Sequence, residues 1–110
     1  MKLIIAYIRP EKLNDVKQAL YAKEIYSMSV TNILGSGRQK GFTETYRGVQ
    51  MEVNLLKKVR IEIGVNDDFE AAATEAIQSA GQTGNEGDGV IFVTECAKAL
   101  RIRTGEDGIL

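Results

Sequence analysis

The chain has 110 residues, of which 44% are hydrophobic and 26% are charged, and its formal net charge is −1. This length suits one domain with one core, and a charge so near zero argues against a protein dedicated to binding nucleic acid. The absence of histidine excludes a His-based catalytic triad and argues against a zinc site, and the single cysteine, Cys96, excludes an internal disulfide.

No apolar run reaches the roughly 20 residues that a membrane-spanning helix needs. The N-terminal stretch MKLIIAYIRPEK contains a short apolar run, but no small-residue cleavage site follows it. We therefore interpret it as a first strand rather than a signal peptide. Together with the lone cysteine, this predicts a cytoplasmic protein that does not insert into a membrane.

The first half of the chain has the pattern strand, helix, strand. Leu3–Ile8 is a compact apolar run typical of a buried strand, and Pro10 suits the first turn of a helix. Between Leu13 and Leu20 the apolar residues recur at three- and four-residue spacing, which predicts an amphipathic helix. Ser29–Leu34 is rich in β-branched residues and predicts a second strand.

The second half repeats this order. Val59–Val65 alternates apolar and other residues, which predicts a third strand. Asp67 and Glu70 form a capping-box-like start to a second helix that Gly81 ends. The inner face of this helix is expected to hold Phe69, Ala72, Ala73, Ala76, Ile77 and Ala80.

Two further stretches follow, a fourth strand at Val90–Val93 and a short alternating piece at Leu100–Arg103. The complete order predicts one α+β domain over residues 1–110, a ferredoxin-like sandwich (βαβ-βαβ) with an antiparallel sheet and both helices on one face.

The connection between the second and third strands, roughly residues 37–57, is anomalous. It is longer than the ~12–15 residues beyond which structureless loops become uncommon in compact domains. We interpret it as a functional arm, although Val53–Leu56 also fits an extension of a strand.

The stretch TGNEGDGVIF, residues 83–92, contains a candidate anion-binding loop. Gly84, Gly87 and Gly89 allow positive φ and close approach to a ligand, and successive backbone amides in such turns suit anions. It is not a Walker loop, because no Gly-Lys-Ser/Thr follows and a strand comes next. On spacing alone, an ordinary glycine-rich connection is the better interpretation.

Two stretches offer cations for such an anion. In RIRTGE, Arg101 and Arg103 would point to one face of a strand and grip a phosphate with two guanidinium groups, although a solvated edge strand fits equally well. The glycine-rich stretch 36–48 carries three cations and suits a segment that orders on binding, although a disordered insertion fits its composition slightly better.

In combination, these pieces resemble the PII family of signal-transduction proteins. The most specific segments are GSGRQKGFTETYRG, LKKVRIEI, TGNEGDGVIFV and RIRTGE, in family order and spacing, and the likeness runs over nearly the whole chain. The resemblance implies a homotrimer with a flexible arm, the T-loop at about residues 37–57, and a C-terminal segment at about residues 100–110. It also implies that ATP and ADP compete for clefts between subunits and that 2-oxoglutarate binds beside Mg-ATP at the base of the arm.

The resemblance also implies roles for individual residues. The nucleotide site would be lined by Ser29, Gly35, Gly37, Arg38, Gln39, Glu62, Gly64, Gly87, Asp88, Gly89, Arg101 and Arg103. Within it, the amides around Asp88 would cradle phosphates, the two C-terminal arginines would come from the neighbouring subunit, and Glu62 and Gly64 would lie where adenine is recognised. 2-Oxoglutarate would be held by Gln39, Lys40, Lys58 and Gly87, with Gln39 also near the Mg²⁺. Contact with a partner protein would fall to Thr43, Glu44, Tyr46 and Arg47.

Two positions depart from the family pattern. Val90 stands where most members carry a lysine that meets the phosphates, and loss of a charge-assisted hydrogen bond costs about 1.5–3 kcal/mol, roughly ten- to a hundredfold in affinity. We therefore expect nucleotide binding to survive but to be weakened. Met51 stands where many bacterial members have a tyrosine that is uridylylated, so we expect no such modification.

These features predict a non-catalytic sensor of nucleotides and 2-oxoglutarate. By resemblance it would regulate nitrogen metabolism through contact of the arm with an ammonium transporter or an enzyme such as glutamine synthetase. The alternative is a divergent nucleotide sensor for inorganic-carbon or metal transport without a 2-oxoglutarate response, which Val90 and Met51 favour and Gln39 and Lys58 oppose. A small enzyme on the same scaffold lacks an evident nucleophile–base pair, and a structural trimer with degenerate clefts is the remaining class.

Overall fold

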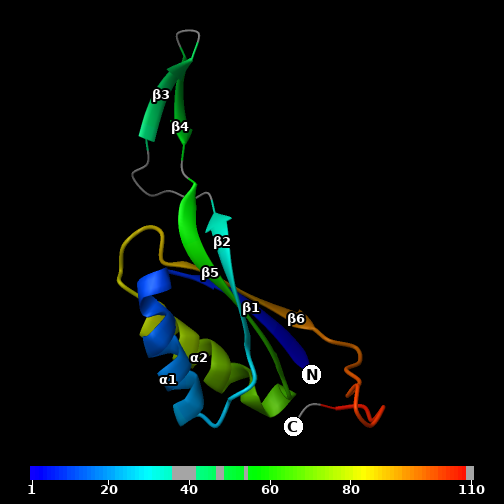
Figure 1. Cartoon of the computed structure of the whole chain (residues 1–110). Helices are drawn as coiled ribbons and strands as arrows, with labels where there is room; N and C mark the ends of the chain where they lie inside the picture. Colours follow the sequence, from blue (N-terminus) through cyan, green and yellow to red (C-terminus); the bar gives the residue numbers. More distant parts are fainter. Residues whose placement is uncertain (36–41, 47–48, 54, 109–110) are drawn as a thin grey trace.

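A computed structural model describes residues 1–35, 42–46, 49–53 and 55–108 (Figure 1). Its main sheet is antiparallel with the strand order β2-β5-β1-β6. The four strands are β1 (Lys2–Ile8), β2 (Ser29–Gly35), β5 (Leu56–Val65) and β6 (Gly89–Glu95). Strand β1, one of the two central strands, pairs with β5 and β6 and so joins the two halves of the chain.

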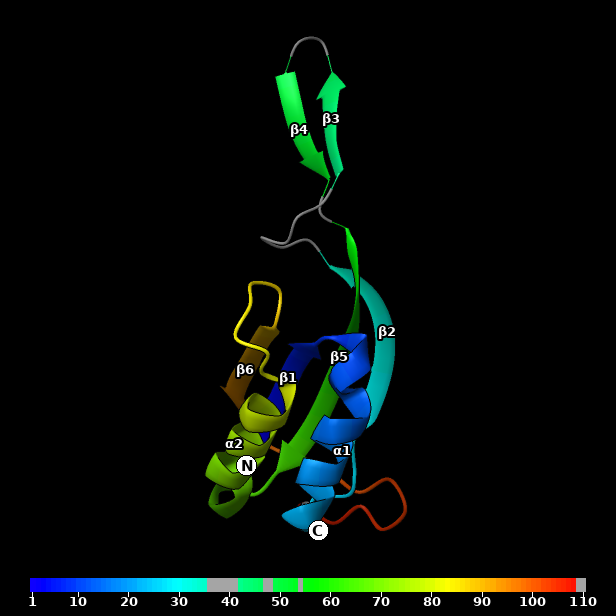
Figure 2. The same cartoon turned by 90° about the vertical axis from the view of Figure 1, so that its left-hand side faces the viewer.

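Two helices cover one face of this sheet (Figure 2). They are α1 (Leu13–Ala22) and α2 (Glu70–Gly81), and each follows a short 3-10 turn, η1 (Pro10–Lys12) or η2 (Asp67–Phe69). Pro10 opens the first of these turns and Gly81 ends the second helix, as predicted. The arrangement confirms the ferredoxin-like α+β fold.

The core lies between the sheet and the helices. Its buried members are Ile4, Ala6, Ile8, Val16, Leu20, Ile25, Val59, Ile61, Ile63, Val65, Ala73, Ala76 and Ile77. Along β1 only alternate residues are buried, whereas Leu3, Ile5 and Tyr7 are half-buried. The predicted buried strand is therefore buried on one face only, because the helices cover just one of the two faces to which successive side chains point.

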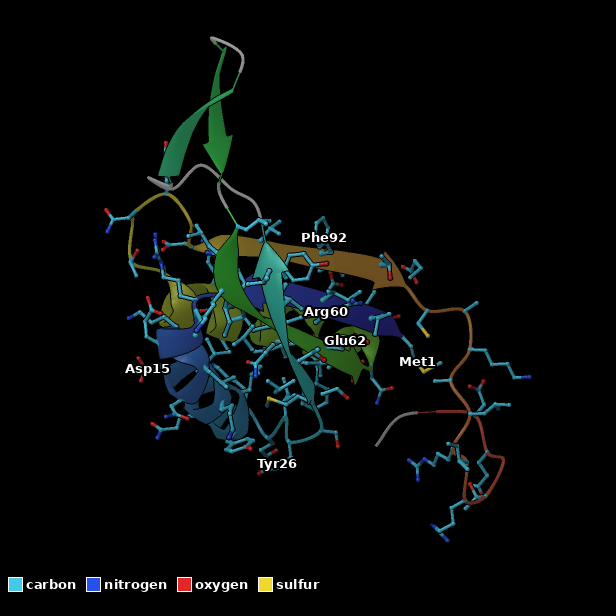
Figure 3. All side chains as sticks on the ribbon, turned by 45° about the horizontal axis from the view of Figure 1, so that its top comes forward. Met1, Asp15, Tyr26, Arg60, Glu62 and Phe92 are labelled. Carbon is cyan, nitrogen blue, oxygen red and sulfur yellow. The ribbon has the colours of Figure 1, made fainter. Side chains whose placement is uncertain are left out.

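The uncovered face of the sheet carries several apolar side chains, which we call the open face: Leu3, Ile5, Tyr7, Val90 and Phe92. The Tyr7 and Phe92 rings pack edge to face with centroids 6.0 Å apart. Even so, Phe92 remains 48% exposed. Figure 3 labels Phe92, Arg60 and Glu62 over the strands, and Asp15 beside α1.

The long connection between β2 and β5 is a hairpin that projects from the body (Figure 1). Strand β3 (Phe42–Tyr46) pairs antiparallel with β4 (Val49–Val53), and the molecule measures 59 × 26 × 19 Å. The arm is thus partly regular, and β5 begins at Leu56, three residues before the predicted start. The strand extension at Val53–Leu56 is wrong, because its two ends belong to different strands.

Three local predictions are also wrong. Asp67 makes no helix cap: its carboxylate lies 2.9 Å from the amino group of Met1, which lowers the pKa of that carboxyl, and α2 begins at Glu70 without a side-chain cap. Phe69 is exposed rather than on the inner face of α2. In the C-terminal segment Leu100 forms an isolated bridge with Asp107, and the chain turns between them rather than continuing as a strand.

The end of α1 contains the one non-glycine residue with positive φ among those described, Glu24 at 62°. Its amide donates to the Tyr21 carbonyl at 2.9 Å, and the Ile25 amide donates to the Leu20 carbonyl at 3.0 Å. The helix thus ends with a residue in the left-handed conformation, a position at which glycine is usual.

Replacing Glu24 with glycine is therefore expected to raise the free energy of unfolding by about 0.5–1 kcal/mol. The left-handed conformation costs an ordinary residue roughly 1–2 kcal/mol, and the added freedom of glycine in the unfolded chain offsets part of the gain. Urea unfolding at fixed protein concentration measures the difference. Lys23→Gly, at φ −95°, is the matched control and should not stabilise; equal behaviour of the two variants would contradict the prediction.

Candidate functional site

The predicted anion-binding loop connects α2 to β6 beside the base of the arm (Figure 1). It borders a cleft of about 420 Å³ whose lining includes Tyr7, Asp88, Gly89 and Val90. Within the loop Gly84 and Gly87 have φ of 90° and 96°, so the positive φ predicted for these glycines is present.

Asp88 closes the loop on itself. Its Oδ2 accepts hydrogen bonds from the amides of Thr83 at 2.8 Å and Gly84 at 2.9 Å, and its Oδ1 accepts one from the Thr83 hydroxyl. The hydrogen bond from Thr83, followed by that from Arg9, holds the pKa of the Asp88 carboxyl well below its usual range. The carboxylate form therefore stabilises the fold above the ordinary carboxyl range, and this stabilisation is lost only as the pH falls far into acid.

Arg9 holds the other side of the loop, a role that was not predicted from the sequence. Its Nε lies 2.9 Å from Asp88 Oδ1, and its Nη2 donates to the Glu86 carbonyl at 2.7 Å. The Arg9 side chain is only 14% exposed. The residue directly follows β1, which pairs with β6, so the sheet itself brings Arg9 to the loop.

Lys58 is the second cation that reaches the loop. From β5 its Nζ donates to the Gly87 carbonyl, so two residues predicted to hold 2-oxoglutarate do meet. Burial, and then the nearby charge of Arg9, lower the pKa of Lys58. Among the residues that the structure describes, no carboxylate forms an ion pair with this ammonium group.

Gly89 marks the place where β6 joins the sheet opposite Ile8. Its φ is 108°, and a Cβ added to it would lie 1.7 Å from the Tyr7 carbonyl oxygen. The backbones therefore approach more closely than any other residue type allows. Val90 follows on the open face opposite Tyr7 and is 43% exposed, so the position where the family pattern has a lysine is an accessible apolar one.

The residues expected near adenine gather elsewhere. Ser29 pairs with Glu62 across β2 and β5, and together with Gly64 these residues line a shallow depression. The Glu62 carboxylate lies 3.1 Å from Arg60 Nε. This depression is at the end of the sheet remote from the arm.

Arg101 and Arg103 also lie beyond that remote end. They follow β6, which starts at the loop and has seven residues, so at ~3.3 Å per residue its two ends lie about 20 Å apart. The segment that carries them turns back on itself, with the Gly105 amide donating to the Arg101 carbonyl at 2.7 Å. Those predicted nucleotide residues that the structure describes thus form two groups at opposite ends of the sheet rather than one site.

The remaining predicted residues belong to the arm. Gly35 ends β2, and a Cβ added to it would lie 3.4 Å from Lys58 Cγ, so it is close to the loop group. Gly37, Arg38, Gln39, Lys40 and Arg47 lie outside the described residues. Thr43, Glu44 and Tyr46 are in β3, where the backbone of Glu44 faces that of Met51 in β4.

Two features are absent from the part of the chain that the structure describes. No group of three His, Cys, Asp or Glu side chains there is arranged to hold a metal ion. Nor is any helix in those ranges both long enough and apolar enough to cross a membrane.

Comparisons with known proteins lead to one family. The family model described as Nitrogen regulatory protein P-II matches residues 1–106. A nitrogen regulatory protein P-II from Cereibacter sphaeroides is 52% identical over 108 residues, which cover 98% of this chain and 96% of the relative. Nitrogen regulatory protein P-II 2 from Methanothermobacter thermautotrophicus is 50% identical over 98% of this chain and 94% of its own length. The nitrogen regulatory protein P-II of Azospirillum brasilense is 51% identical over 98% of this chain and 96% of its own length.

The close approach at Gly89 generates a stability prediction. Gly89→Ala should lower the free energy of unfolding by about 3 kcal/mol or more, because backbone strain and a clash with the Tyr7 carbonyl each cost roughly 1–3 kcal/mol. Gly84→Ala is the control: its φ is also positive, but nothing lies within 4 Å of the added Cβ, so only strain of roughly 1–2 kcal/mol is expected. Urea unfolding distinguishes the variants, and equal losses would show that the close approach is unimportant.

Proposed function

Because the chain belongs to the nitrogen regulatory protein P-II family, we propose that it is a non-catalytic sensor that binds ATP or ADP and 2-oxoglutarate and regulates nitrogen metabolism through its arm. The relatives are named regulatory proteins rather than enzymes. The partner would be an ammonium transporter or a nitrogen-assimilation enzyme such as glutamine synthetase, as the resemblance implies.

The observation that carries this proposal is the separation of the predicted nucleotide residues into two groups. The loop group offers backbone amides near Gly87 for phosphates, whereas the remote group offers the Ser29–Glu62 depression and two arginines. Neither group is a complete site, and about 20 Å of strand separates them. A cleft between two copies of the chain would bring the loop group of one copy to the remote group of the next.

The open face supports assembly of several copies. Leu3, Ile5, Tyr7, Val90 and Phe92 form an apolar surface on a sheet face that the chain leaves uncovered. Burying it stabilises by about 25 cal/mol per Å² of apolar area, which favours association. We propose the homotrimer that the resemblance implies, with one cleft between each pair of neighbours.

Charge at the cleft follows from the same arrangement. Asp88 is paired with Arg9, and Val90 adds no cation, so among the described residues the loop group can offer a polyphosphate little positive charge beyond that of Lys58. Arg101 and Arg103 from the neighbouring copy would supply it as forked donors. Mg²⁺ would be held by the phosphates together with Gln39, and it would neutralise part of their charge.

Regulation would follow from differential binding. Lys58 and Gly87 lie at the end of β5 from which the arm departs, so a carboxylate bound by Lys58 sits where it can favour one conformation of the arm. Each effector changes partner affinity only by the difference between its affinities for the two conformations. The second candidate, a divergent nucleotide sensor for inorganic-carbon or metal transport without a 2-oxoglutarate response, rests on the apolar Val90.

Thermal unfolding with ADP, with Mg-ATP, and with Mg-ATP plus 2-oxoglutarate tests the proposal. We expect the melting temperature to rise with Mg-ATP and to rise further with 2-oxoglutarate, because ligands that bind only the folded state stabilise it. Light scattering should give a mass of three chains. A response to nucleotide alone would favour the second candidate, and no response would indicate a structural assembly with degenerate clefts.

Adding the missing charge provides a sharper test. Val90→Lys should tighten ATP binding by roughly ten- to a hundredfold in isothermal titration, the value of one charge-assisted hydrogen bond. The control, Thr94→Lys, adds the same charge on the same face of β6 but farther from the loop, and should leave the affinity unchanged. Equal effects of both variants would indicate general attraction, and no effect of Val90→Lys would place the phosphates elsewhere.

A further inference from the structure

The contacts of Arg9 are those of a residue that holds the loop in place rather than of one that binds a ligand directly. Its guanidinium spans two acceptors of the loop, the Asp88 carboxylate at 2.9 Å and the Glu86 carbonyl at 2.7 Å. Asp88 in turn accepts the amides of Thr83 and Gly84. To grip a phosphate itself, Arg9 would have to leave a carboxylate that is only 24% exposed.

The two carbonyl contacts fix the directions of two consecutive peptide units. Arg9 holds the Glu86 carbonyl and Lys58 holds the Gly87 carbonyl. None of the described peptide bonds is cis, so in each unit the N–H points opposite to the C=O. The amides of Gly87 and Asp88 therefore point away from the two cations.

This geometry allows a cation to assist anion binding without touching the anion. A carbonyl that accepts a hydrogen bond from a charged donor polarises its peptide unit, and amides set in one direction form an anion-binding concavity. The positive φ of Gly87, 96°, is the conformation that such a concavity requires.

We propose that Arg9 is a positioning residue of the phosphate-binding loop: it orients the Glu86–Gly87 peptide toward the phosphate and does not contact the phosphate. The proposal rests on the proposed nucleotide-binding function and adds to it a residue from the end of β1. Lys58 orients the next peptide unit in the same way, but it is also predicted to bind 2-oxoglutarate. A variant of Arg9 therefore tests the positioning role without changing that second site.

The test compares ADP with adenosine, which lacks phosphates, by displacement of a fluorescent nucleotide. Arg9→Gln should weaken ADP binding about tenfold or more and leave adenosine within about twofold. Arg9→Lys keeps the charge but cannot span both acceptors, so its ADP affinity should lie closer to that of Arg9→Gln than to wild type. The control is Lys12→Gln, which removes a charge whose partner is Asp15 and should bind both ligands normally.

Amide hydrogen exchange without ligand supplies an independent readout. In Arg9→Gln the Thr83 and Gly84 amides, which donate to the carboxylate that Arg9 holds, should exchange faster than in wild type, while amides of the β1–β5 ladder remain protected. If wild type binds no ADP, the proposed function fails and this inference fails with it. If wild type binds ADP and both Arg9 variants keep its ratio of ADP to adenosine affinity, only the positioning role is overturned. If Arg9→Lys binds ADP normally while Arg9→Gln does not, Arg9 is a direct phosphate ligand and the positioning role is overturned. If the affinities for ADP and for adenosine fall equally, Arg9 contributes only to the stability of the fold.

Discussion

The junction between the end of β1 and the start of β6 is the constraint on which the candidate site depends. There the Gly89 backbone packs against the Tyr7 carbonyl, and one residue beyond the ladder Arg9 meets Asp88. Because β1 is one of the two central strands of the sheet, the pairing that builds the core also holds the loop. The loop is therefore anchored to a central strand of the sheet and not only to its two neighbours along the chain.

This junction also explains acidic residues in a loop proposed to bind anions. Asp88 is not a group presented to a ligand, since its oxygens accept two loop amides, a hydroxyl and Arg9. The carboxylate shapes the loop and is neutralised by Arg9, and the Gly87 amide is left on the other side. An acidic side chain and an anion site are compatible here because the carboxylate is used internally.

The remaining architecture follows from a sheet that is covered on one side only. The helices bury one face, and the open face with Tyr7, Val90 and Phe92 stays apolar and accessible. The two groups of predicted nucleotide residues lie at opposite ends of this sheet. The described part of a single chain thus leaves an apolar surface uncovered and keeps the predicted nucleotide residues apart, and the proposed assembly of copies would cover the surface and bring those residues together.

The sequence by itself determined the family, which the match over residues 1–106 confirms, and the order of the four strands and two helices of the body, but not the strands β3 and β4 of the arm. Periodicity and glycine placement are local properties, so β2, α1, the end of α2 and the glycine loop were all predictable. What the tertiary structure decided is which distant residues meet. In the sequence Arg9 only marks the end of the first strand before Pro10. Its contact with Asp88, 79 residues away, exists because β1 pairs with β6. The predictions of a capping box at Asp67 and of a strand at Arg101–Arg103 were wrong for the same reason. A local pattern shows which hydrogen bonds are possible, but tertiary packing determines which partners a residue meets.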